Sequence, residues 1–265
     1  MRILAFILSL TAAPLGAHEF WIEPSEYQVS ANGNLRGDIV NGQEFEGTKL
    51  PYVPQRFVHF VNYVGGERQN VEGRTGDLPA MDVAPVAEGL NVVAYQARSA
   101  TVDYETWEKF QKFVDHKDFG DVLSVHQARG LPMDGFKEIY SRYSKTLIGV
   151  GNAAGADSRI GMVTEIVALT NPYTDDLSGG VQVQVFYKND VRPNTQVEVF
   201  IKAPDGAVSI ELYRTDDRGI ATVPVVSGNS YMVDAVVLRE PSESFAAQSG
   251  AVWETLWANL TFAAP

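Results

Sequence analysis

The chain contains no cysteine, and only four of its 265 residues are histidines. Disulfide bonds, thiolate metal sites and thiol catalysis are therefore excluded. Any transition-metal ligand must come from a histidine, a carboxylate, a methionine or the N-terminal amine. The few histidines are for this reason the first residues to consider as functional.

Basic residues are also scarce, with 21 Lys+Arg against 33 Asp+Glu and a formal net charge of −12. An acidic surface argues against nucleic acid and anionic lipid as partners, and it favours the attraction of cations. The sequence also lacks a Gly-x-Ser-x-Gly motif, a glycine-rich phosphate loop and a His-Glu-x-x-His motif. These absences favour a protein that is not an enzyme.

The first 17 residues have the pattern of a signal peptide. A basic residue, Arg2, precedes a short apolar run, and small residues follow up to Ala17. Cleavage after Ala13 would leave Pro14 as the first residue, which peptidases tolerate poorly. We therefore predict cleavage after Ala17 and export to the periplasm. No later apolar run reaches about 18 residues, so we expect no direct membrane insertion.

His18 would then be the first residue of the exported protein. A histidine at a free N-terminus offers both its α-amine and its imidazole Nδ1, so it can chelate one metal ion. Nitrogen-rich sites of this kind suit Cu(II) and Ni(II). The alternative interpretation is that His18 is only the first residue of an edge strand.

Residues 18–102 have the pattern of a β-sandwich. Phe20 and Ile22 alternate with Glu19, Trp21 and Glu23, which is typical of a half-buried strand with Trp21 in a core. Glycine-containing turns recur between apolar segments. The further predicted strands span 36–40, 55–63 and 90–97.

Residues 103–148 are predicted to form a helical insert packed on the first domain. Asp103 is a candidate N-cap for a helix that ends near Gly120, and a second helix spans 122–128. A third helix is predicted from Pro132 to Leu147, because its apolar residues recur at helical spacing. The glycine- and alanine-rich residues 149–161 are predicted to be a linker.

Residues 162–265 return to alternating apolar and polar positions, which predicts an immunoglobulin-like sandwich. The segment order and the turn at 215–219 resemble a transthyretin-like or collagen-binding B-type module. The fold class expected for the whole chain is therefore mainly β, with two β-sandwich domains and a helical insert between them. The predicted strands span 181–185, 197–201, 220–225, 231–238 and 253–262.

The other metal ligands must be assembled from separate elements, since no two histidines have the spacing of a local helical metal motif. His126 on the second helix is the first choice for a further nitrogen, and His116 is the second. Glu19 and Glu23 could supply oxygen ligands, although ordinary solvated carboxylates explain them as well. His59 fits a packed or edge strand position better than a metal site.

Four segments in order resemble an exported domain-of-unknown-function family described as a periplasmic component of cobalt/nickel transport. They are His18-Glu19-Phe20-Trp21-Ile22-Glu23-Pro24, Glu138-Ile139-Tyr140-Ser141-Arg142-Tyr143-Ser144-Lys145, Thr215-Asp216-Asp217-Arg218-Gly219 and Trp253-Glu254-Thr255-Leu256-Trp257-Ala258-Asn259-Leu260-Thr261-Phe262. The resemblance extends over essentially the whole exported chain. It implies a periplasmic accessory protein for nickel or cobalt uptake, with a membrane transporter component as partner.

Three functional hypotheses follow from these observations. The first is a periplasmic accessory protein that binds a divalent metal, nickel or cobalt, through His18. The second is a copper enzyme or copper carrier in which the N-terminal histidine forms part of a histidine brace. The third is an envelope interaction module without metal. The affinity order of divalent metals favours copper in most nitrogen-rich sites, so the residues alone do not select the metal.

Overall fold

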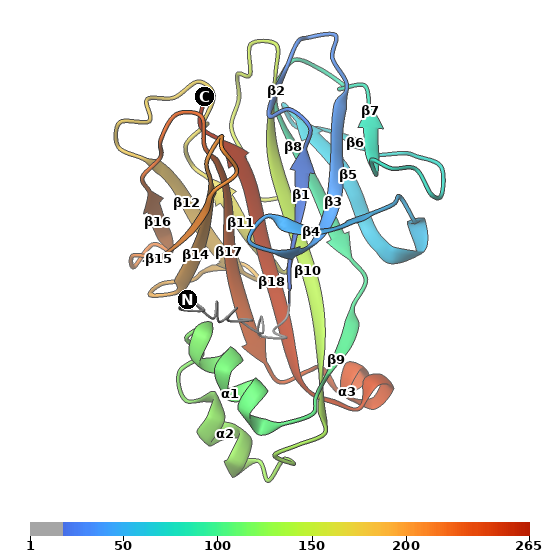
Figure 1. Cartoon of the computed structure of the whole chain (residues 1–265), viewed down its shortest axis with the longest axis vertical. Coiled ribbons are helices and arrows are strands. Elements are labelled where there is room, and N and C mark those ends of the chain that lie inside the picture. Colours follow the sequence, from blue (N-terminus) through green and yellow to red (C-terminus); the bar gives the residue numbers. More distant parts are fainter. Residues whose placement is uncertain (1–17) are drawn as a thin grey trace, which may run out of the picture.

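The computed structural model describes residues 18–265, so the predicted signal peptide at 1–17 lies outside the described residues. In this part of the chain the fold is mainly β, as predicted, and three sheets form its layers (Figure 1). The helical elements are η1 (Pro54–Arg56), α1 (Trp107–His116), α2 (Val122–Ala128) and α3 (Glu243–Ser249). No helix in this part of the chain is long and apolar enough to cross a membrane.

The middle layer is a ten-stranded sheet with β10 and β18 at its centre. These two long strands are parallel, and Arg142 lies opposite Trp257 in their register. The hydrogen-bonded order is β15 (Val208–Arg214), β14 (Gln196–Lys202), β17 (Ser230–Arg239), β18 (Ala251–Ala263), β10 (Phe136–Val150), β8 (Gly89–Ala97), β5 (Phe57–Val64) and β6 (Glu67–Asn70). Two short strands, β2 (Gln28–Val29) and β9 (Ala100–Tyr104), also pair with β10.

A four-stranded sheet covers each face of this middle layer. One consists of β11 (Thr164–Ala168), β12 (Val181–Tyr187), β13 (Asp190–Val191) and β16 (Ile220–Val223). The other consists of β1 (Glu19–Pro24), β3 (Leu35–Gln43), β4 (Glu46–Leu50) and β7 (Met81–Val83). The two predicted sandwiches therefore share one central sheet.

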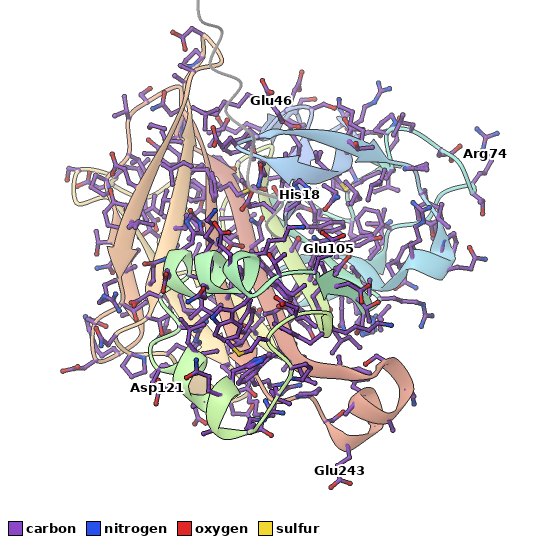
Figure 2. All side chains as sticks on the ribbon, turned by 60° about the horizontal axis from the view of Figure 1, so that its bottom comes forward. His18, Glu46, Arg74, Glu105, Asp121 and Glu243 are labelled. Carbon is purple, nitrogen blue, oxygen red and sulfur yellow. The ribbon has the colours of Figure 1, made fainter. Side chains whose placement is uncertain are left out.

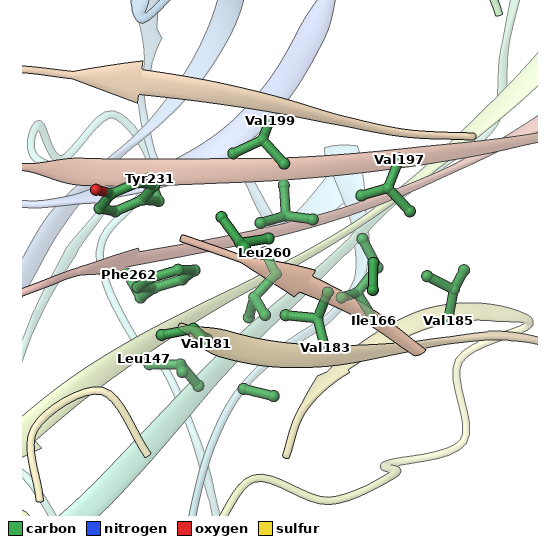
Figure 3. Close-up of a cluster of buried hydrophobic side chains, with 14 of the residues drawn as sticks. Leu147, Ile166, Val181, Val183, Val185, Val197, Val199, Tyr231, Leu260 and Phe262 are labelled. Carbon is green, nitrogen blue, oxygen red and sulfur yellow. The ribbon is translucent and has the colours of Figure 1, made fainter. Parts of the chain in front are cut away.

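The C-terminal sandwich has an apolar core between β12 and the central sheet (Figure 3). Val181, Val183 and Val185 alternate along β12 and are fully buried. They pack against inward residues of the central sheet, including Val199 and Leu260. Full burial of one such side chain contributes roughly 1.5–3 kcal/mol, so this core stabilises the sandwich strongly.

The N-terminal core lies on the opposite face of the central sheet. Ile22 and Ile39 of the outer sheet pack there with Val93 of β8 and Ile148 of β10. Leu147, the neighbour of Ile148, packs in the C-terminal core instead. This alternation along β10 is what allows one strand to contribute to both sandwiches.

The predicted third helix is wrong, because residues 136–150 form strand β10. Its apolar residues fit helical spacing, but β10 is covered on both faces and buries polar as well as apolar side chains, among them Glu138 and Lys145. No alternation of apolar and polar residues therefore marks this segment as a strand. Asp103, the predicted helix cap, lies in β9, and α1 begins at Trp107. The segment 103–148 is therefore helical only at α1 and α2. Gly149 and Val150 of the predicted linker belong to β10 as well.

Other predicted elements are confirmed. The second helix has the predicted bounds, Val122–Ala128. The strand predicted at 253–262 is the middle of β18, and Trp21 is fully buried in a core, as expected. His59 lies in β5 as expected but is exposed next to a register shift between Phe57 and His59, so it is not packed in a core.

One buried ion cluster holds the segment after β10 against the sheet. Lys145 Nζ lies 2.6 Å from Asp157 Oδ1 and 3.2 Å from Glu165 Oε1, and all three side chains are at most 1% exposed. Asp157 also accepts hydrogen bonds from the backbone N–H groups of Ser158 and Ala168. Residues 157–168 are thus tied to the centre of the sheet by charge.

Another buried acid, Glu138, lies on the other face of β10. Glu138 is 0% exposed and accepts hydrogen bonds from the hydroxyl groups of Tyr104 and Thr255. Burial outweighs these hydrogen bonds and the charge of Arg142, and it raises the pKa of Glu138 to about 7. The folded protein therefore holds a proton that the unfolded chain would release at lower pH.

We predict that Lys145→Met lowers the free energy of unfolding by about 3–5 kcal/mol, because it leaves two buried carboxylates without their cation. The control is Lys49→Met, which removes a pair with Asp38 in which the lysine side chain is 57% exposed. Loss of an exposed pair costs about 0–1 kcal/mol. Urea unfolding measures both changes, and equal stability of the two variants would contradict the prediction.

We also predict that Glu138→Gln gains stability relative to the wild type as the pH rises from about 5 to 8. In this interval Glu138 is already ionised in the unfolded wild type. In the folded wild type it must lose its proton near its raised pKa of about 7, which costs folding free energy as the pH rises. The glutamine keeps a neutral side chain throughout. The difference in unfolding free energy should grow by on the order of 1–3 kcal/mol. A difference that stays constant over this pH range would contradict the prediction.

Candidate functional site

A row of polar residues crosses four strands of the central sheet. Glu198 of β14 is paired with Asp234 of β17, Asp234 with Asn259 of β18, and Asn259 with Ser144 of β10. Directly paired residues of neighbouring strands lie on the same face of a sheet. The row therefore places two carboxylates, an amide and a hydroxyl side by side, and all four residues are at most 4% exposed.

The row lies where two different covers of the sheet meet. On one side β1 is fixed by hydrogen bonds from Ser144 Oγ to the Phe20 carbonyl and from Thr261 Oγ1 to the Ile22 carbonyl. On the other side α1 and α2 pack on an aromatic cluster that includes Trp253 and Trp257. Between these covers, side chains from β1 and from the end of α1 reach the polar row.

We call the charged group at this junction the seam cluster, which consists of Glu19, Lys117, Glu198, Asp234 and Asn259. Lys117 follows the last residue of α1 and is 8% exposed. Its ammonium group donates a hydrogen bond to Glu198, lies 3.4 Å from Asp234 Oδ2 and sits 4.9 Å from the centre of the Trp257 ring. One lysine is thus the nearest cation for two buried acids.

The three acids of the seam cluster differ in their pKa values. Burial raises the pKa of Glu19 to about 7 and that of Asp234 to about 6, although Lys117 opposes both shifts. Burial acts on Glu198 too, but hydrogen bonds from His116 and Lys117 outweigh it and lower the pKa of Glu198 to about 2. The pKa of Lys117 is raised, because the three acids together overcome its burial. Arg142 and Arg192 also act on Asp234 electrostatically, but Lys117 is the cation that forms ion pairs with both Glu198 and Asp234.

His18 lies at the surface next to this cluster. It is exposed and immediately precedes β1, and its carbonyl accepts a hydrogen bond of 2.9 Å from Arg142 Nη2. The Arg142 guanidinium also lies 4.5 Å from the ring of Tyr140 and 5.5 Å from that of Phe20. Figure 2 looks from the end that carries the helices, and it labels His18 between the N-terminal sheet and α1 in this view. The backbone of His18 is held while its side chain faces solvent.

His126, the first choice for a further nitrogen ligand, lies in a different environment. It is fully buried among aromatic rings, including those of Trp107 and Phe136 at 4.8 and 4.7 Å. The indole N–H of Trp253 donates to His126 Nδ1 at 2.9 Å, so Nε2 carries the proton and donates to the Pro132 carbonyl at 3.0 Å. Both ring nitrogens are used, and the geometry therefore favours a packing role over metal binding.

The remaining predicted ligands are distributed around the junction. The His116 side chain is 56% exposed, and its Nε2 lies 3.1 Å from Glu198 Oε1. Glu19 points into the seam cluster, whereas Glu23 pairs with Lys202 at 3.1 Å. Within residues 18–265, no three histidine, aspartate or glutamate side chains form a ready group of metal ligands. The structure thus brings Glu19 and His116 to one region but does not complete a metal site there.

Four buried members of this region, Lys117, Glu198, Asp234 and Asn259, were not predicted from the sequence. A signal existed for two of them. Glu198 interrupts the apolar run 197–201, and Asp234 interrupts the apolar run 231–238. A charge within a buried strand is costly unless it is paired, so such positions point to a specific network. Their pairing with Asn259 depends on strand register, which the sequence pattern does not give.

Comparisons with known proteins give a family for the chain. Among solved structures, a tetra-tandem repeat in the extending region of a large adhesion protein is 13% identical, and the match covers 94% of this chain and 50% of that chain. The chain thus spans about half the length of that structure, and a TM-score of 0.21 supports no inference from it. No curated protein matches the chain. Residues 15–239 match the family model for a domain of unknown function, DUF4198, and the chain therefore belongs to the DUF4198 family.

Proposed function

We propose that this protein is a periplasmic accessory protein for nickel or cobalt uptake that binds a divalent metal through its mature N-terminal His18. The observation that carries the proposal is the position of His18, which is exposed while Arg142 holds its carbonyl and β1 fixes the chain that follows. Once the leader is removed, the α-amine and the imidazole of this residue become available together at the surface.

A chelate from one residue leaves positions for further ligands. His116 is the better candidate for a third nitrogen, since it is exposed and lies beside Glu198 of the same junction. Glu19 follows His18 directly and can supply an oxygen or accept a hydrogen bond from a bound ligand. The acidic surface would raise the local concentration of cations around the site.

The transport role rests on the resemblance of the four sequence motifs to a family described as a component of cobalt/nickel transport. In this role the protein would deliver its metal to a membrane transporter component. The same chelate would also accept copper, because Cu(II) exceeds Ni(II) and Co(II) in affinity for most sites. Selection of nickel or cobalt would then depend on which metal is available in the compartment.

The test is a metal titration by calorimetry with Ni²⁺, Co²⁺ and Cu²⁺, using protein whose first residue has been verified as His18 by N-terminal sequencing. We predict one tightly bound metal per chain. His18→Ala should weaken binding by about two orders of magnitude or more, because it removes the imidazole and leaves the α-amine as a single ligand without a chelate. One extra alanine ahead of His18 should also weaken binding, although every side chain is retained.

Two histidine variants serve as controls. His59→Ala removes an exposed histidine on β5, and His126→Phe replaces a buried ring whose nitrogens are already hydrogen bonded. Both should keep the wild-type metal affinity in folded protein. Unchanged affinity in the form with an extra alanine would show that the amine is not a ligand, and it would contradict the proposal.

A further inference from the structure

The seam cluster has a feature that the proposed His18 chelate does not use. Three carboxylates, from Glu19, Glu198 and Asp234, are buried to within 6% exposure around one lysine. Lys117 contributes a single positive charge, and its Nζ contacts two of the acids directly, whereas Arg142 and Arg192 act on Asp234 without forming an ion pair with it. Buried carboxylates are costly unless cations compensate them, so this arrangement is suited to a cation of higher charge.

Asn259 provides a second and independent observation. It is 2% exposed, and neither its side-chain nitrogen nor its side-chain oxygen has a hydrogen-bond partner among the described residues. Its register partner is Asp234, so the amide lies on the same face of the sheet as the acids. Buried polar groups normally have partners, and an amide oxygen without one is a free ligand for a hard cation.

We propose that the seam cluster is a second cation site, suited to a divalent cation with oxygen ligands, and that the Lys117 side chain occupies this site in the structure described here. The ligands would be carboxylate oxygens of Glu198 and Asp234 and the amide oxygen of Asn259, with Glu19 beside them. This ligand set shares only the neighbouring Glu19 with the nitrogen-rich chelate at His18. The proposal therefore goes beyond the proposed function and can be tested separately.

Lys117 enters the seam cluster from its edge. It lies just after the end of α1, where its flexible side chain reaches into the cluster from the side. Its neighbour His116 is 56% exposed while contacting the same carboxylate, Glu198, so the entrance to the cluster is at the surface. A divalent cation that binds here would take the place of the Lys117 ammonium group, and the Lys117 side chain would rotate into solvent on the side of His116.

The experiment uses Mn²⁺, which prefers oxygen ligands and is detected directly by electron paramagnetic resonance. Lys117→Met removes the competing cation and retains an apolar stem over Trp257. We predict that this variant binds Mn²⁺ at least about tenfold more tightly than the wild type, a difference of about 1.4 kcal/mol. Adding Asp234→Asn to Lys117→Met should abolish the gain. His18→Ala should leave Mn²⁺ binding unchanged, which separates this site from the His18 chelate.

A second measurement does not require Lys117→Met to fold. In the wild type, Asn259→Leu should weaken Mn²⁺ binding at least about tenfold, because it removes one of the ligands. The proposal is overturned if folded Lys117→Met binds Mn²⁺ no better than the wild type. It is also overturned if Lys117→Met does not fold and Asn259→Leu leaves the Mn²⁺ affinity of the wild type unchanged.

Discussion

The parallel pairing of β10 with β18 is the interaction on which the rest of this structure depends. It joins residues 137–146 to residues 251–261, which are more than a hundred positions apart in the chain. The pair forms the centre of the ten-stranded sheet, and its two faces supply both hydrophobic cores. The same register aligns Ser144 with Asn259 and so completes the polar row. One strand pair thus determines the packing of the layers and the position of the candidate site.

The candidate site exists because two covers meet on one face of this sheet. β1 and its sheet protect one part of the face, and α1 with α2 protects the other. A junction between covers can hold charged groups that neither apolar core would accept. At this junction the protein combines an exposed histidine, an arginine that holds its backbone and a cluster of buried acids around one lysine. The burial of the acids and of Lys117 makes the region electrostatically distinct from an ordinary acidic surface.

The sequence predicted those features that depend on local pattern. Alternation along Val181, Val183 and Val185 indicated a strand with one buried face, and the helix predicted at 122–128 has these bounds in the structure. The prediction from the sequence failed at β10, because a strand buried on both faces lacks the alternation of apolar and polar residues that distinguishes a strand from a helix. The site was predictable only at His18, Glu19 and His116. The roles of Asp234 and Asn259 arise from long-range strand register, and the hydrogen bonds that engage His126 arise from its contact with Trp253, which lies 127 residues away.

The central functional claim is that the amine of His18 is itself a metal ligand, and electron paramagnetic resonance can test this claim most directly. Protein is produced with histidine that carries ¹⁵N only at the α-nitrogen, is verified to begin at His18, and is loaded with one equivalent of Cu²⁺ as a probe. A histidine α-nitrogen can bind strongly as an amine only at the N-terminus. The account predicts a large ¹⁵N hyperfine coupling from a directly bound nitrogen, together with ¹⁴N coupling from imidazole. A spectrum with imidazole ¹⁴N coupling alone would contradict it.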